Sequence, residues 1–265
     1  MENTGEQSSI IQIEKADYAK LKGREINKNR HEQLPTYVIW DETLQLQQIN
    51  LAKKAVENFF KYTGLKQDNQ KLLFLGNWKS EYPINQDGQL AKFESVEWHV
   101  KSSLVQGNRI DSKKAVGRNM FFDIYQQPPK GQPHWEIMFT NRDLHYEGLN
   151  FVFGTSVPDL GTIISFKRID DFFRENPQYK EYSEEVMETI IIHELGHTIF
   201  NLPLNRRGEN NLDSKLGGGH CKSKDCCMQQ GNDVKTFLAI TLEKEKDKNP
   251  FCEECIKDIK INYKN

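Results

Sequence analysis

The chain has 265 residues, with 36 lysines and arginines against 38 aspartates and glutamates and a formal net charge of −2. Hydrophobic residues make up 37% of it and charged residues 28%, which is typical of a globular protein long enough to bury a substantial core. The near balance of charge excludes a strongly basic surface for nucleic acid, and no apolar run approaches the roughly 18 residues of a membrane span. Because residues 1–15 lack the basic start and apolar stretch of a secretory signal, we expect a cytoplasmic protein.

The N-terminal half predicts an arm followed by alternating strands and a helix. Residues 1–33 are polar, and we expect a loosely held arm there. A helix is predicted over 43–62, where apolar residues recur at helical spacing, and Gly64 follows as its C-cap. Strands are predicted at 36–40, 71–75, 93–100, 120–125, 135–139, 149–153 and 162–166.

The C-terminal half contains the most regular helical pattern, over 184–200. Its apolar positions define one face, which predicts an amphipathic helix, and Ser183 is the candidate N-cap. Pro203 disfavours helix at the residue before it and so ends the segment. A polar, glycine-rich loop follows over 204–219, and a further helix is predicted over 233–244.

The helix over 184–200 carries the motif His193-Glu194-Leu195-Gly196-His197. Histidines at positions i and i+4 project from the same helical face, so both rings can reach one metal ion. Zinc binds imidazole nitrogen and lowers the pKa of its bound water toward 7. The sequence therefore predicts that His193 and His197 are zinc ligands and that Glu194 is the general base.

A catalytic zinc needs a third protein ligand while one position stays open to water. Three residues after the motif are candidates: Glu209, Asp213 and His220. His220 is favoured because it offers the same donor as the first two ligands and follows three glycines that let the chain approach closely.

All five cysteines lie in the last 45 residues. In a reducing compartment such a cluster favours metal ligands over disulfides. Cys221 and Cys226 are followed by the pair Cys252 and Cys255, and four thiolates fill every position of a tetrahedral structural zinc. Cys227 is left over and is interpreted as a buried or free thiol, although its adjacency to Cys226 leaves open which of the two binds.

In this order the residues resemble the archaemetzincins, a family in the metzincin clan of zinc peptidases. The family pattern runs HExxHxxGxxHC, then x4-C-x-M, then a spacer and CxxC. Matching positions are His193, Glu194, His197, His220, Cys221, Cys226, Met228, Cys252 and Cys255. The resemblance implies that Met228 is the methionine of the Met-turn beneath the catalytic zinc. It extends upstream to the predicted strands after residue 135.

The resemblance also implies the fold and the domain organisation. We expect an α+β or α/β fold of the metzincin type, with a twisted mixed sheet and an active-site helix. A small C-terminal subdomain would be held together by a zinc site. Residues 34–265 would form one catalytic domain after the arm over 1–33, divided into 34–200 and 201–265. In metzincins an edge strand aligns the peptide substrate, and its counterpart by position is 149–153, unless that segment is a buried strand without a substrate role.

Two departures from the family pattern concern the end of the active-site helix. Phe200 stands where the family has glycine, so Asn201 would have to adopt the left-handed turn. His220 follows His197 by 23 residues instead of six, which inserts 17 residues within the ligand set. The inserted loop over 201–219 would form a lid or narrow the cleft.

The resulting hypothesis is a zinc metallopeptidase with two zinc ions, one catalytic and one structural, that acts on a peptide or protein. The alternative is a non-catalytic zinc-binding protein whose cleft is blocked and which acts through partner binding. A third possibility keeps the metal chemistry but directs it at another amide or ester. No nucleic acid or membrane partner is expected.

Overall fold

A computed structural model describes residues 34–65, 72–77, 95–117, 135–158, 161–202, 219–243 and 249–262. Four of the sequence-based expectations lie outside these ranges. They are the N-terminal arm, the strand at 120–125, the two alternative ligands Glu209 and Asp213, and most of the loop over 201–219.

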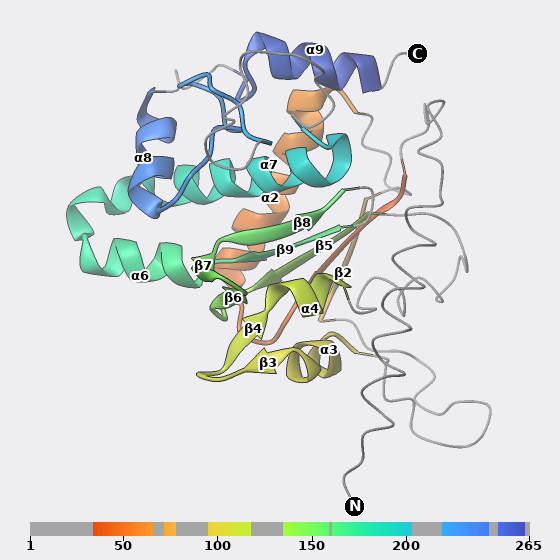
Figure 1. Cartoon of the computed structure of the whole chain (residues 1–265), viewed down its shortest axis with the longest axis vertical. Coiled ribbons are helices and arrows are strands. Elements are labelled where there is room, and N and C mark those ends of the chain that lie inside the picture. Colours follow the sequence, from red (N-terminus) through yellow and green to blue (C-terminus); the bar gives the residue numbers. More distant parts are fainter. Residues whose placement is uncertain are drawn as a thin grey trace, which may run out of the picture.

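A five-stranded sheet forms the centre of the described part, in the order β2-β1-β5-β9-β8 (Figure 1). The first four strands are parallel, whereas β8 pairs antiparallel with β9 at the edge. The bounds are β1 Thr36–Trp40, β2 Leu72–Gly76, β5 Trp135–Thr140, β8 Gly154–Val157 and β9 Gly161–Ser165. The mixed sheet that the family resemblance implies is therefore confirmed.

Side chains alternate between the two faces of this sheet and form two separate cores. Val38, Ile137 and Phe139 belong to the core that packs against the long helices α2 (Leu46–Thr63) and α7 (Ser183–Phe200). Ile39 and Met138, their neighbours in the chain, belong to the core on the opposite face.

The opposite face is covered by a smaller layer of short elements. A four-stranded sheet has the order β3-β4-β6-β7 and lies beside two short helices (Figure 1). The bounds are α3 Val96–Ser102, β3 Leu104–Val105, β4 Arg109–Asp111, α4 Ser112–Gly117, β6 Leu144–Tyr146 and β7 Leu149–Val152. The two layers thus sandwich the central sheet.

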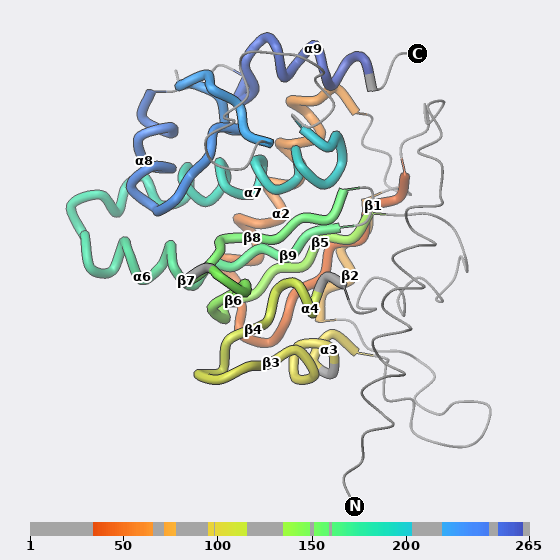
Figure 2. The backbone as a smooth tube through the Cα atoms, in the orientation of Figure 1, coloured from red at the N-terminus to blue at the C-terminus, as the bar shows by residue number. Residues whose placement is uncertain are grey.

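The remaining helices follow β9 in the chain. They are α6 Lys167–Glu175, the 3₁₀ helix η2 Pro177–Tyr182, α8 Val234–Glu243 and α9 Glu253–Asn262. α8 and α9 contact α7 on the side away from the sheet, so α7 is covered from both sides (Figure 2). Of the helices in the described ranges, none is both long and apolar enough to cross a membrane.

The predictions agree with the structure where apolar residues recur at regular spacing, and they are wrong in several short segments. The strand at 36–40 and the helix ends at Gly64 and Asn201 are confirmed, with φ of 72° and 53° at the two caps. The predicted strand at 93–100 is wrong, because most of it belongs to α3. Ser183 is the first residue of α7 and not its N-cap, and α6 and α9 were not predicted.

The prediction of an amphipathic active-site helix is also wrong in its exposure pattern. From Ile190 to Phe200 every residue of α7 is buried except His197, which is half-buried. A helix that is buried on all sides has no polar face exposed to solvent, so its sequence is not amphipathic. In this stretch of α7 the predicted ligand His197 is thus the position that keeps partial contact with solvent.

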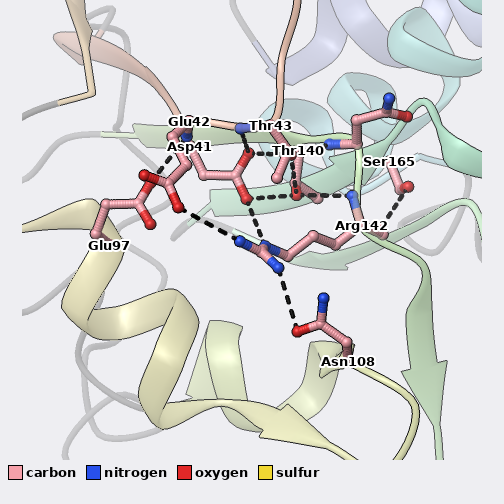
Figure 3. Close-up of polar contacts among 9 residues, drawn as sticks. Asp41, Glu42, Thr43, Glu97, Asn108, Thr140, Arg142 and Ser165 are labelled. Atoms are coloured by element: carbon pink, nitrogen blue, oxygen red, sulfur yellow. Dashed lines mark hydrogen bonds and ion pairs between the residues drawn. The ribbon is translucent and has the colours of Figure 1, made fainter.

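A network of hydrogen bonds connects the C-terminal ends of the parallel strands β1 and β5. Its centre is the buried Asp41 (Figure 3). One oxygen of Asp41 accepts from the backbone N–H of Thr43 at 3.1 Å and from its hydroxyl at 2.5 Å. The other accepts from the Thr140 hydroxyl at 2.8 Å and from Arg142 Nε at 3.2 Å. The carboxylate thus has both its charge and its hydrogen-bonding capacity satisfied.

The same network reaches into the second layer. Arg142 also donates to Asn108 Oδ1 at 3.2 Å, just before β4, and the Glu42 N–H donates to Glu97 Oε1 at 2.8 Å on α3 (Figure 3). Charge-assisted hydrogen bonds of this kind hold the covering layer in register with the strand ends.

We expect Asp41→Ala to lower the free energy of unfolding by about 3 kcal/mol, because it leaves Arg142, whose side chain is 14% exposed, without its buried counter-charge. Glu42→Ala is the matched control, since its carboxylate is 59% exposed and 3.7 Å from the same guanidinium, and it should cost less than about 0.5 kcal/mol. Urea denaturation midpoints measure both. Equal losses in the two variants would contradict the role of Asp41.

Candidate metal and active site

The end of α7 carries the buried residues His193 and Glu194 and the half-buried His197. The helix stops because Asn201 adopts the left-handed conformation, with its N–H directed at the carbonyls of Gly196 and His197. The expectation that asparagine replaces the family glycine in this turn is confirmed.

Each histidine of the helix has a backbone carbonyl as partner of its Nδ1. His193 Nδ1 lies 2.7 Å from the Cys227 carbonyl, and His197 Nδ1 lies 2.5 Å from the Leu202 carbonyl. A carbonyl oxygen only accepts, so both Nδ1 atoms carry the proton and both Nε2 atoms keep a free lone pair. Such outer partners orient imidazoles for metal binding.

His220 joins these two rings from the C-terminal segment. The three histidines have metal-binding atoms within 4.8 Å of one another, and the two Nε2 atoms of His193 and His197 are 3.1 Å apart. Zinc–nitrogen bonds of about 2.0–2.1 Å in a tetrahedron place ligand nitrogens roughly 3.3 Å apart. The donor set present therefore fits a zinc ion.

The surroundings favour the neutral form of both helix histidines. Burial, followed by the nearby His197 and His220, holds the pKa of His193 well below its usual value. Burial and then His220 lower the pKa of His197 to about 4. Neutral imidazole is the form that binds a metal.

The Glu194 side chain packs against β8. Its side chain is buried, and Ser156 Oγ donates a hydrogen bond of 2.5 Å to Oε2. Burial raises the pKa of Glu194 to about 7, although the hydrogen bond from Ser156 acts in the opposite direction. Such a carboxyl is suited to accepting and returning a proton.

Met228 lies directly against the helix at Gly196. A Cβ atom at position 196 would overlap the Met228 sulfur, so glycine is required there by space. The Met228 carbonyl accepts from the Cys221 N–H at 2.8 Å, which closes the turn that contains both residues. Met228 therefore packs against α7 at the residue before His197.

The four cysteines Cys221, Cys226, Cys252 and Cys255 form a second group, with sulfur atoms within 4.8 Å of one another. The Cys221–Cys252 and Cys226–Cys255 sulfur pairs are both 3.6 Å apart, far beyond the disulfide length of about 2.0 Å. Zinc–sulfur bonds of about 2.3 Å in a tetrahedron require sulfurs roughly 3.8 Å apart. The group fits a closed zinc site.

The thiols of this group differ in their electrostatic surroundings. Hydrogen bonds from Cys221 and then the other two thiols lower the pKa of Cys252. The Cys252 N–H also points at the Cys226 sulfur at 3.4 Å. Such contacts favour thiolate, the form that zinc binds, at Cys252. Hydrogen bonds among the same thiols raise the pKa of Cys221 and of Cys255.

Cys227 stands outside the four-thiol group and acts through its backbone. Its side chain is buried, its N–H donates to the Pro250 carbonyl at 2.8 Å, and its carbonyl accepts from His193. The sequence had no signal for this role, because any residue offers a backbone carbonyl.

The strand beside Glu194 is β8 and not the predicted 149–153. Leu149–Val152 forms β7, which pairs with β6 in the smaller sheet, and the chain changes sheets at the buried Phe153. Sequence reasoning missed Gly154 and Ser156. The glycine within a strand was the available signal, since it often marks a close approach of another group.

No family model matches the chain. An archaemetzincin from Methanopyrus kandleri is 29% identical over 136 residues, which are 51% of this chain and 61% of that relative. An archaemetzincin from Sulfolobus acidocaldarius is 29% identical over 118 residues, 44% of this chain and 52% of that relative. The chain thus aligns with little more than half the length of these relatives.

Two solved structures have a similar fold. The crystal structure of the Methanopyrus kandleri archaemetzincin matches with a TM-score of 0.51 at 19% identity, covering 89% of this chain and 98% of that one. A zinc-dependent peptidase from Methanocorpusculum labreanum matches with a TM-score of 0.53 at 17% identity, covering 84% and 99%. The resemblance that the motifs indicate is therefore confirmed. This chain is similar to archaemetzincins in sequence over about half of its length, and its fold is similar to those of the two solved structures over most of it.

Proposed function

We propose that this protein is a zinc-dependent metallopeptidase that hydrolyses peptide bonds in a peptide or protein substrate. The observation that carries the proposal is the convergence of His193, His197 and His220, whose metal-binding atoms lie within 4.8 Å of one another next to the buried Glu194. The names of the related proteins, archaemetzincin and zinc-dependent peptidase, support the same assignment.

In this proposal the three histidines hold the catalytic zinc through imidazole nitrogens. Zinc bound there supplies a Lewis acid for the substrate carbonyl and makes water more acidic. Glu194 would take a proton from the attacking water and return it to the nitrogen of the departing amine. The Cys227 and Leu202 carbonyls keep both helix imidazoles in the binding tautomer.

A second zinc would be held by Cys221, Cys226, Cys252 and Cys255 with a structural role. Four thiolates leave no position for a reacting water. The short segment from His220 to Met228 would then connect both metals, because it contains one catalytic ligand, two thiols and the carbonyl partner of His193. Residues 201–265 would act as a subdomain built on this second site.

A peptide substrate would align along β8, as the family resemblance implies for an edge strand. Within the described ranges β8 pairs only with β9, and in this proposal its other backbone edge receives the peptide as a further strand. Strand addition supplies affinity through main-chain hydrogen bonds and brings the peptide beside Glu194.

We expect Glu194→Ala to lower kcat for peptide cleavage at least about 100-fold while the zinc content stays unchanged, because it removes the proton acceptor and no ligand. Glu184→Ala, at an exposed position in the first turn of the same helix, is the control and should cleave like the wild type. Fluorogenic peptide assays and metal analysis measure the two quantities. Cleavage that persists in Glu194→Ala would rule out this role, and a wild type without any cleavage would favour the binding-only alternative.

We expect protein purified without added metal to contain two zinc ions per chain and His193→Ala to contain one. Cys255→Ser should lose both, because the four-thiol site holds the segment that carries His220. Cys227→Ser is the matched control and should keep both, since its thiol lies outside the four-thiol group. Metal analysis by mass spectrometry decides this, and zinc loss in Cys227→Ser equal to that in Cys255→Ser would contradict the assignment.

A further inference from the structure

The edge strand β8 runs between α7 and the short helix α4, and its side chains alternate between them. The Thr155 hydroxyl faces α4 and donates to Ser112 Oγ at 2.7 Å. The neighbouring positions Gly154 and Ser156 face α7 and meet Glu194. Both residues of β8 that point toward the active-site helix therefore contact the same carboxylate.

Gly154 provides the space that the Glu194 side chain occupies. A Cβ atom at position 154 would lie 2.5 Å from Glu194 Cδ and 2.7 Å from both Cγ and Oε1. The backbone of Gly154 is not in the left-handed region, so an ordinary residue would suit its conformation. The three atoms nearest to this position all belong to Glu194, so an added side chain would meet the glutamate first.

Ser156 provides the hydrogen bond that holds the carboxylate in this space. Its hydroxyl lies 2.5 Å from Glu194 Oε2, 3.1 Å from the Glu194 carbonyl and 3.0 Å from Thr162 Oγ1. A hydroxyl has one proton, and the charge-assisted bond to the carboxylate is the strongest of these contacts. Thr162 on the paired strand β9 limits the rotation of the hydroxyl.

We propose that Gly154 and Ser156 are positioning residues, through which the substrate-aligning strand β8 sets the orientation of the general base Glu194. This inference rests on the proposed peptidase function. The helix determines where the Glu194 backbone lies, whereas the gap and the hydroxyl of β8 determine where its carboxylate points. A peptide added to β8 would thus be held by the same strand that holds the base.

Steady-state kinetics tests the effect on catalysis. Because a displacement of about 1 Å at a reacting group can cost 100-fold in rate, Gly154→Ala should lower kcat about 100-fold, and Ser156→Ala about tenfold. KM should stay within about twofold in both, since neither substitution alters the backbone edge. Ser112→Ala is the matched control, because it removes a buried hydroxyl that contacts β8 from the opposite side, and it should leave kcat unchanged.

A double-mutant cycle in thermal stability tests the contact without using activity. Gly154→Ala should lower Tm by roughly 5 °C, because the new methyl group overlaps Glu194. In a Glu194→Ala background the same substitution should cost nothing, because the shortened side chain lacks the overlapping atoms. Interaction between contacting sites appears in this way as non-additivity. Additive losses would overturn the steric part of the proposal.

The outcomes separate this inference from the function on which it rests. A wild type that cleaves peptides, together with Ser156→Ala and Gly154→Ala variants of unchanged kcat and intact zinc content, overturns the positioning role and leaves the peptidase assignment standing. A wild type that cleaves no peptide overturns the proposed function and with it the catalytic meaning of the contact. A fall in kcat at constant KM, confined to the two β8 variants, supports both.

Discussion

The buried His193 and the half-buried His197 each direct Nδ1–H at a hydrogen-bond acceptor, and the chain supplies both acceptors from its own backbone. The Leu202 carbonyl serves His197 and becomes available because Asn201 turns the chain back immediately after the helix. The Cys227 carbonyl serves His193 from a segment 34 residues away in sequence. An unsatisfied donor at this depth would cost as much as a lost hydrogen bond, so the helix end and the cysteine-rich segment depend on each other.

This dependence explains why the two candidate metal groups lie so close together in the chain. His220 and Cys221 are neighbours, as are Cys226 and Cys227, and Met228 follows at once. Cys221 donates to the Met228 carbonyl, which folds the segment back on itself, and Gly196 leaves room for the methionine side chain. One short loop thereby contributes to both groups, and its position is set by the thiols on one side and by the helix on the other.

The central sheet contacts the same helix, α7, on the side opposite to α8 and α9. Its parallel strands bury one face against α2 and α7, and the network around Asp41 holds their ends to the smaller layer. The antiparallel strand β8 lies at the edge of the sheet beside the buried Glu194 and donates a hydrogen bond to its carboxylate from Ser156. The glutamate and the histidines of one helical motif are therefore oriented by different parts of the molecule, the histidines by carbonyls and the glutamate by a strand.

Local pattern in the sequence determined the features whose signals are local. These are the long helices, the parallel strands, the left-handed turn at Asn201 and the pairing of His193 with His197 on one helical face. The tertiary structure alone decided which side of α7 is covered, which strand lies against Glu194, and that the carbonyl of Cys227 faces His193. The physical reason is that a backbone carbonyl carries no residue-specific signal. The need for glycine at position 154 likewise depends on a side chain that is distant in the sequence, that of Glu194.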